Sequence, residues 1–88
     1  MMKILTEEQH KNLSPEEKII YSLKCGRELL GGGQSLHHLT IASFKIDNYS
    51  NRKLVQKFLY KLRKNYKVKY FREKGVWYWL GNEYWLGK

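Results

Sequence analysis

The spacing of apolar residues predicts a helix at the start of the main domain. Ser14-Pro15-Glu16-Glu17 forms a capping box, in which a serine and a glutamate three positions apart satisfy each other's backbone amides. Apolar residues at Ile19, Ile20 and Leu23 then follow a helical period, and Gly26 is where we expect this helix to end.

The middle of the chain predicts two more helices. The glycine run at residues 31–33 lacks the lysine and serine or threonine of a phosphate-binding loop, so we interpret it as a flexible connector. Ser35 is placed to cap a short second helix. A turn rich in capping residues at 47–51 then precedes a third helix, expected from about Arg52 to Asn65.

Two strands close the pattern. Residues 67–72 and 76–80 are typical of strands, and Glu73-Lys74-Gly75 between them is typical of a tight turn. Three helices followed by a β-hairpin is the order of an α+β winged helix-turn-helix domain, in which the hairpin is the wing and the third helix usually reads nucleic acid.

The length of 88 residues allows one domain with one modest core. We assign residues 14–83 to the winged helix, 1–13 to an N-terminal extension with a short helical turn, and 84–88 to a short C-terminal end. The single cysteine, Cys25, excludes an internal disulfide and is typical of a reducing compartment. No apolar run approaches a membrane span, so we expect a cytoplasmic protein.

The predicted third helix has two contrasting faces. Its apolar face collects Leu54, Val55, Phe58, Leu59 and Leu62. Its opposite face carries Lys53, Lys57, Tyr60 and Lys64, with Gln56 and Arg63 beside them. Lysines suit contacts with phosphates, and a tyrosine ring among them can stack on an unpaired base.

Charge strengthens this interpretation. The net charge of +9 lies after Phe44, where twelve basic residues face three acidic ones, whereas five of each precede that point. Such an asymmetry is typical of a folded domain that binds a polyanion. The predicted RNA-binding residues are Arg52, Lys53, Lys57, Tyr60, Arg63, Lys64, Lys67, Lys69, Arg72 and Lys74.

The second strand is apolar on both faces, with Val76, Tyr78 and Leu80 on one and Trp77 and Trp79 on the other. A small domain covers only one face, so the other is a stacking platform or a docking surface for a protein. We favour docking, and we expect the docking residues to be Trp77, Trp79, Tyr84 and Trp85.

Catalytic and metal sites are not indicated. His37 and His38 are adjacent, and His10 and Cys25 lie far from them, so no metal-ligand spacing exists. No nucleophile and base can be paired from the sequence. We therefore expect a protein that is not an enzyme, with no cofactor, metal or small-molecule substrate.

Three segments resemble the S-ten family of eukaryotic-type small-subunit ribosomal proteins (the plectin/S-ten domain). They are Ile20-Tyr21-Ser22-Leu23, the basic helix at 54–62, and Val76-Trp77-Tyr78-Trp79-Leu80-Gly81-Asn82-Glu83, which is similar to the family's aromatic-Leu-x-Asn-Glu run. The resemblance covers about residues 16–83 and suggests a shortened member. It implies a structural component of the small subunit's head, near the beak, bound to ribosomal RNA and to neighbouring ribosomal proteins.

Three other functions stay open. A winged-helix transcription regulator would bind duplex DNA. A sensor of left-handed nucleic acid is weakly suggested by Gln56, Tyr60 and a wing tryptophan, although the paired prolines of such wings are missing. A protein–protein adaptor is disfavoured by the net charge.

Overall fold

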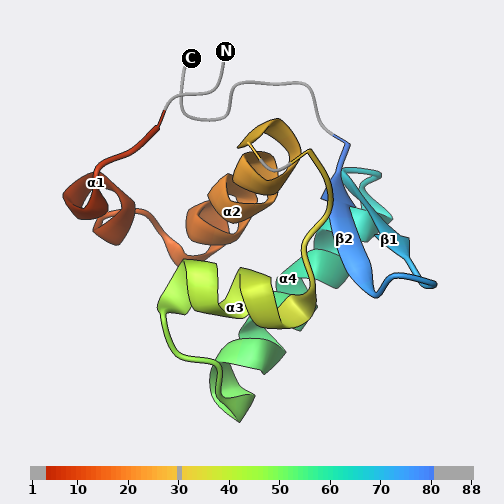
Figure 1. Cartoon of the computed structure of the whole chain (residues 1–88). Helices are drawn as coiled ribbons and strands as arrows, with labels where there is room; N and C mark the ends of the chain where they lie inside the picture. The colour runs from red at the N-terminus through yellow and green to blue at the C-terminus, as the bar shows by residue number, and fades with distance from the viewer. Residues whose placement is uncertain (1–3, 30, 81–88) are drawn as a thin grey trace.

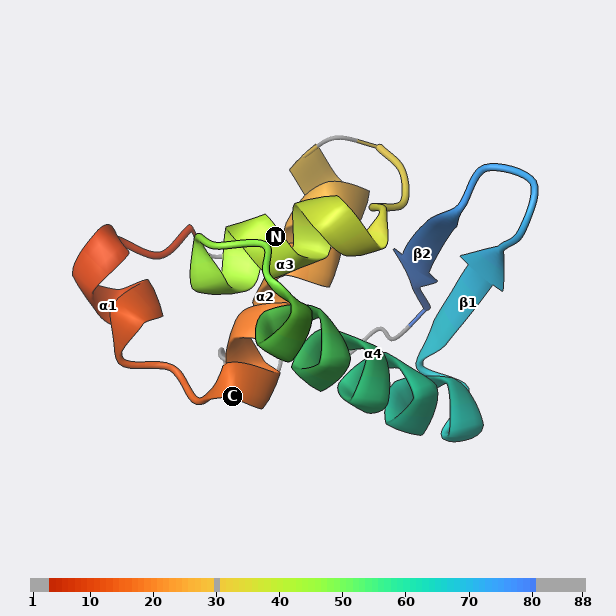
Figure 2. The same cartoon turned by 90° about the horizontal axis from the view of Figure 1, so that it is seen from below.

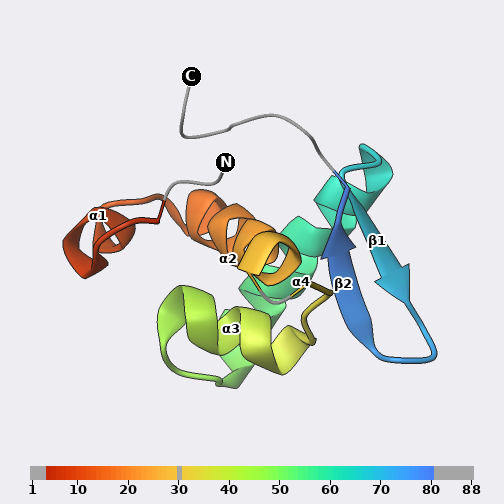
Figure 3. The same ribbon diagram turned by 45° about the horizontal axis from the view of Figure 1, so that its top comes forward.

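A computed structural model of the chain describes residues 4–29 and 31–80 (Figure 1). The elements are α1 (Glu7–Lys11), α2 (Pro15–Leu29), α3 (Leu36–Phe44), α4 (Tyr49–Lys64), β1 (Val68–Phe71) and β2 (Val76–Trp79). Helices α2, α3 and α4 pack together, the antiparallel β1–β2 hairpin lies beside them, and α1 lies on the side away from the hairpin (Figures 1 and 3). The predicted α+β order of three main helices and a hairpin is confirmed.

Side-chain caps set where the helices begin. The Ser14 hydroxyl accepts a hydrogen bond from the Glu17 amide at 3.2 Å, and the Glu17 carboxylate accepts one from the Ser14 amide at 2.9 Å, so the predicted capping box is present. Ser35 caps α3, as expected. Asn48 caps α4 by accepting from the Asn51 amide at 2.8 Å, so this helix begins three residues before the predicted Arg52.

Gly26 does not end the first main helix, because α2 continues to Leu29. Gly26 is buried inside α2, and a Cβ there would lie 2.5 Å from Nε2 of Gln34. That buried amide donates to the Ser22 carbonyl at 2.6 Å. Glycine is needed here because a polar side chain from outside the helix approaches its backbone closely.

The glycine connector also has a defined end. The Gln34 amide donates to the Trp77 carbonyl at 2.9 Å, and the Trp77 amide donates to the Gln34 carbonyl at 2.7 Å. A Cβ on Gly33 would lie 2.7 Å from that same Trp77 oxygen. The connector thus ends in an isolated antiparallel β-bridge that joins the α2–α3 junction to β2.

One hydrophobic core joins the helices to the hairpin. Its buried members are Ile19, Leu23, Leu39, Val55, Phe58, Leu59, Leu62, Val68, Trp77 and Trp79. In the hairpin Val68 is opposite Trp79 and Tyr70 is opposite Trp77, and directly opposed residues share a face of the sheet.

The prediction that Trp77 and Trp79 form an exposed docking surface is wrong. Only 6% and 3% of their surfaces are exposed, respectively. Because Val68 follows α4 closely and packs into the core, its cross-strand partner Trp79 and the next inward residue Trp77 are buried with it. Tyr84 and Trp85 lie outside the described residues.

A bilayer span needs ~20 predominantly apolar residues. Across residues 4–29 and 31–80 no helix has the length and apolarity to cross a membrane, and α4, the longest, has 16 residues.

Candidate nucleic-acid interface

Helix α4 has the two faces that its sequence predicts. Val55, Phe58, Leu59 and Leu62 are buried, whereas Leu54 lies at the edge of the apolar face and is exposed. The opposite face is exposed at Lys53, Lys57, Tyr60 and Lys64, which we call the basic row. Arg63 beside the row is exposed and Gln56 is half-buried.

The basic row adjoins the inner face of the hairpin. Two tyrosine rings pack against Trp77. The centre of the Tyr60 ring lies 6.0 Å from that of the Trp77 ring in an edge-on arrangement, and the centre of the Tyr70 ring lies 4.8 Å from it. Tyr60 nevertheless keeps 55% of its surface exposed. Figure 2 shows α4 ending beside β1, so the last turns of the helix and the hairpin form one surface.

The hairpin cations are distributed over several sides of the wing. Arg72 and Lys74 are exposed in the turn between the strands. Lys69 is opposite Tyr78, on the face of the hairpin turned away from Trp77, and its Nζ lies 5.2 Å from the centre of the Phe71 ring. Lys67 is half-buried. The structure therefore does not bring Lys69 together with the basic row.

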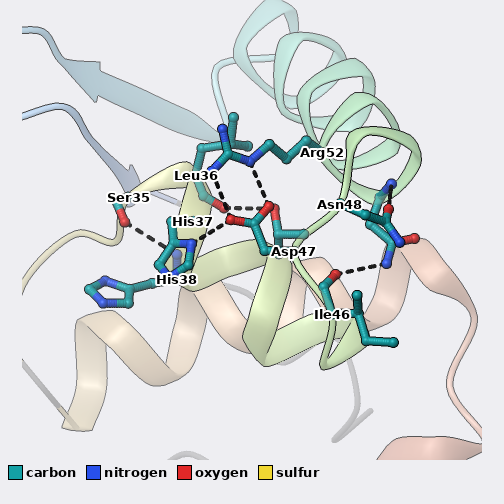
Figure 4. A network of polar contacts seen from close by, with 10 residues as sticks. Ser35, Leu36, His37, His38, Ile46, Asp47, Asn48 and Arg52 are labelled. Carbon is teal, nitrogen blue, oxygen red and sulfur yellow. Dashed lines mark hydrogen bonds and ion pairs between the residues drawn. The ribbon is translucent and has the colours of Figure 1, made fainter.

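Arg52, one of the predicted RNA-binding residues, forms an ion pair within the fold. Its Nε lies 2.5 Å from Oδ1 of Asp47 and its Nη2 lies 2.7 Å from Oδ2, while Nδ1 of His37 donates to the same carboxylate (Figure 4). These hydrogen bonds, first from Arg52 and then from His37, hold the pKa of Asp47 well below its usual range. The guanidinium, predicted to bind RNA, is used to join the start of α4 to α3.

A groove lies at the C-terminal end of α4, with a volume of about 580 Å³. We call it the tyrosine groove. Its lining residues are Tyr60, Lys61, Arg63, Lys64 and Tyr66.

Sequence reasoning missed two members of this groove, Lys61 and Tyr66. The sequence does contain a signal that Tyr66 is unusual. It follows the expected helix end at Asn65, and the residue after a helix end is commonly glycine. Lys61 lies 3.8 Å from the Glu16 carboxylate, whereas Arg63 and Lys64 form no ion pair with any described residue.

The titratable residues of the first half lie elsewhere. His10, Tyr21 and Cys25 line a smaller cavity of about 230 Å³ between α1, α2 and α3. Burial raises the pKa of the Cys25 thiol, and burial together with Lys18 and Lys45 lowers the pKa of His10. Within the described residues, no group of three or more histidine, cysteine or acidic side chains is arranged to hold a metal ion.

Comparison with models of known protein families, with curated proteins and with solved structures finds no match to this chain. The resemblance to the S-ten family therefore stays a prediction. The candidate interface therefore consists of a basic row on α4, a wing turn with two cations, and a groove lined by two tyrosines.

Proposed function

We propose that the chain binds RNA through α4, as a structural constituent of the small ribosomal subunit. The observation that carries RNA binding is the basic row, in which three lysines and a tyrosine are exposed on the face opposite the core. The assignment to the small subunit, with ribosomal RNA and neighbouring ribosomal proteins as partners, depends on the resemblance to the S-ten family.

The chemistry of the row favours backbone contacts with a strand that has unpaired bases. From Lys53 to Lys64 the row extends about 16 Å along the helix at 1.5 Å per residue. Lysine ammonium groups bind phosphates without reading base edges. Tyr60 packs against Trp77 and still keeps 55% of its surface exposed, so it is accessible to a base that could stack on it. Helix α4 has two arginines, Arg52 and Arg63. Arg52 is paired with Asp47, so Arg63 is the arginine of this helix that is left to contact a base edge.

The test is the salt dependence of binding to a single-stranded RNA, measured by fluorescence anisotropy. The Lys53→Gln/Lys57→Gln double variant should lower the slope of log K against log salt by about 1.4, since each phosphate contact to a single strand contributes about 0.7. The matched control is Lys11→Gln/Lys45→Gln, which removes two exposed charges on the α1 and α3 side. Equal slopes for the two variants would contradict binding by the row.

Assembly is tested separately, by sedimenting a cell lysate on a sucrose gradient and detecting this chain. Co-migration with small subunits that is lost at high salt supports the ribosomal assignment. Migration with free protein, together with tighter binding to duplex DNA than to RNA of equal length, would instead support a transcription regulator.

A further inference from the structure

The tyrosine groove is open to solvent, and aromatic and cationic residues line it together. Its volume of about 580 Å³ lies within the range of ligand pockets. Two tyrosines and the basic residues of the last helical turn line it. Tyr60 and Lys64 belong to both the groove and the basic row, so the groove continues the proposed RNA surface.

Tyr66 occupies a backbone position that normally selects glycine. The Lys67 amide donates to the Leu62 carbonyl at 2.9 Å, and the Tyr66 amide donates to the Arg63 carbonyl at 3.1 Å. These two bonds are a Schellman motif, whose residue after the cap adopts a left-handed conformation. Tyr66 has φ of 59°, a strained value for a bulky residue.

The fold gains little from this side chain in return for the strain. Tyr66 is 86% exposed, the most exposed of the large apolar and aromatic side chains in the described residues. A glycine would close the helix equally well and with less strain. The ring is therefore a candidate for contact with something outside the chain.

The basic residues of the groove can serve either the helix or a ligand, and the two roles must be separated. Basic side chains in a last helical turn interact favourably with the helix dipole, and this accounts for part of their presence. The dipole does not account for an exposed tyrosine next to them. Arg63 and Lys64, which have no acidic partner among residues 4–29 and 31–80, add an anion-binding side to an aromatic one.

We propose that the tyrosine groove holds an unpaired nucleotide, whose base stacks on Tyr66 while Arg63 and Lys64 bind its phosphates. This inference rests on the proposed RNA binding and specifies the ligand as a single-stranded segment. Stacking of a base on an aromatic side chain and salt-dependent contacts with phosphates are how proteins hold single strands without reading sequence.

The experiment compares Tyr66→Gly with Tyr66→Phe in the full chain. Tyr66→Gly should raise the melting temperature and weaken binding to a short oligouridine about fivefold or more, because stacking on one ring contributes at least that factor. Tyr66→Phe, which keeps the ring, should retain wild-type affinity. The Tyr66→Asn variant, whose residue also tolerates the left-handed conformation, repeats the test if the glycine variant does not fold.

A second probe isolates the base. An abasic oligomer of equal length should bind the wild type more weakly than oligouridine, and Tyr66→Gly should remove that difference. Wild-type affinity of Tyr66→Gly for oligouridine, or a lower melting temperature in both the glycine and asparagine variants, would overturn the inference. If Lys53→Gln/Lys57→Gln still lowers the salt slope in that case, RNA binding stands and only the groove is wrong. If the wild type binds no single strand, both proposals fail.

Discussion

The two ends of α4 each carry an exposed arginine, and the two arginines have opposite surroundings. At the N-terminal end Asn48 caps the helix, and Asp47 is bound by both Arg52 and His37. At the C-terminal end Arg63 and Lys64 are exposed without an acidic partner in the described part of the chain, and Tyr66 is exposed in a strained conformation. The fold thus holds the cation Arg52 at the first end, whereas at the second end it leaves Arg63 and Lys64 without an acidic partner among the described residues.

The difference shows that a charge count does not locate a binding surface. Arg52 and Arg63 are both exposed arginines of one helix in the basic half of the chain. Arg52 has Asp47 five residues before it, across the cap, whereas no acid lies at a comparable position near Arg63. Whether a cation can bind an external anion depends on such local pairing, and a pairing with two hydrogen bonds to one carboxylate is especially stable.

The largest predicted change in the free energy of unfolding comes from the residues that hold Trp77 against the C-terminal half of α4. Tyr60 packs on Trp77, and Trp77 is held by the backbone bonds to Gln34 that Gly33 makes possible. Gly33→Ala places a methyl group 2.7 Å from the Trp77 oxygen, so we expect a loss of about 1–3 kcal/mol in the free energy of unfolding. Urea denaturation followed by tryptophan fluorescence measures it.

Its matched control is Gly32→Ala. A Cβ on Gly32 meets nothing within 4 Å, and this glycine has no positive φ. The control should therefore unfold within about 0.5 kcal/mol of the wild type, as surface substitutions usually do. Equal losses for the two variants would mean that the Gln34–Trp77 bridge does not require a glycine.

A smaller effect is expected at the N-terminal end, where Asp47→Asn keeps the shape of the side chain and removes its charge. We expect a lower urea midpoint, because the carboxylate that joins Arg52 to His37 is lost. The affinity for RNA should not fall, since the change removes no cation of the basic row and releases Arg52 beside it. If Asp47→Asn instead has normal stability and weaker RNA binding, then Asp47 serves RNA binding rather than the fold, contrary to the comparison made above.

Acid should weaken the same contact. Because the pKa of Asp47 is lower in the folded chain than its ordinary value of 3.8, the ionised form stabilises the fold above about pH 4. That contribution is lost as pH falls further, through the depressed pKa. The urea midpoint of the wild type should thus fall more steeply below pH 4 than that of Asp47→Asn. Glu8→Gln, at an exposed position in α1, serves as the control and should follow the wild type.

The order of elements could be predicted because local signals agree with the fold. The capping box at Ser14 and the cap at Ser35 mark helix starts, and the apolar period of α4 identifies its buried side. The prediction that Gly26 ends the helix is wrong because the sequence does not distinguish two uses of glycine. A glycine can end a helix, or it can lie inside a helix where a side chain from elsewhere approaches the backbone. Only the contact with Gln34, eight residues away, distinguishes them.

The candidate site could be predicted in part. Helical periodicity places Lys53, Lys57, Tyr60 and Lys64 on one face without knowledge of the partners. A strand's alternation gives two faces but does not say which one is buried, so the sequence does not reveal that the core covers Trp77 and Trp79. The choice depends on pairing with Val68, a long-range contact.

The smallest predicted effect compares two single lysines that the sequence treats as equivalent. Lys57 lies in the basic row, whereas Lys69 lies on the hairpin face turned away from Trp77. If RNA follows α4 into the tyrosine groove, Lys57→Gln should lower the salt slope by about 0.7 and Lys69→Gln should leave it unchanged. Fluorescence anisotropy at several salt concentrations resolves this difference. A drop for Lys69→Gln equal to that for Lys57→Gln would mean that the strand crosses the outer face of the wing, where Phe71 and Tyr78 are opposed edge-on, and that the interface is wider than α4.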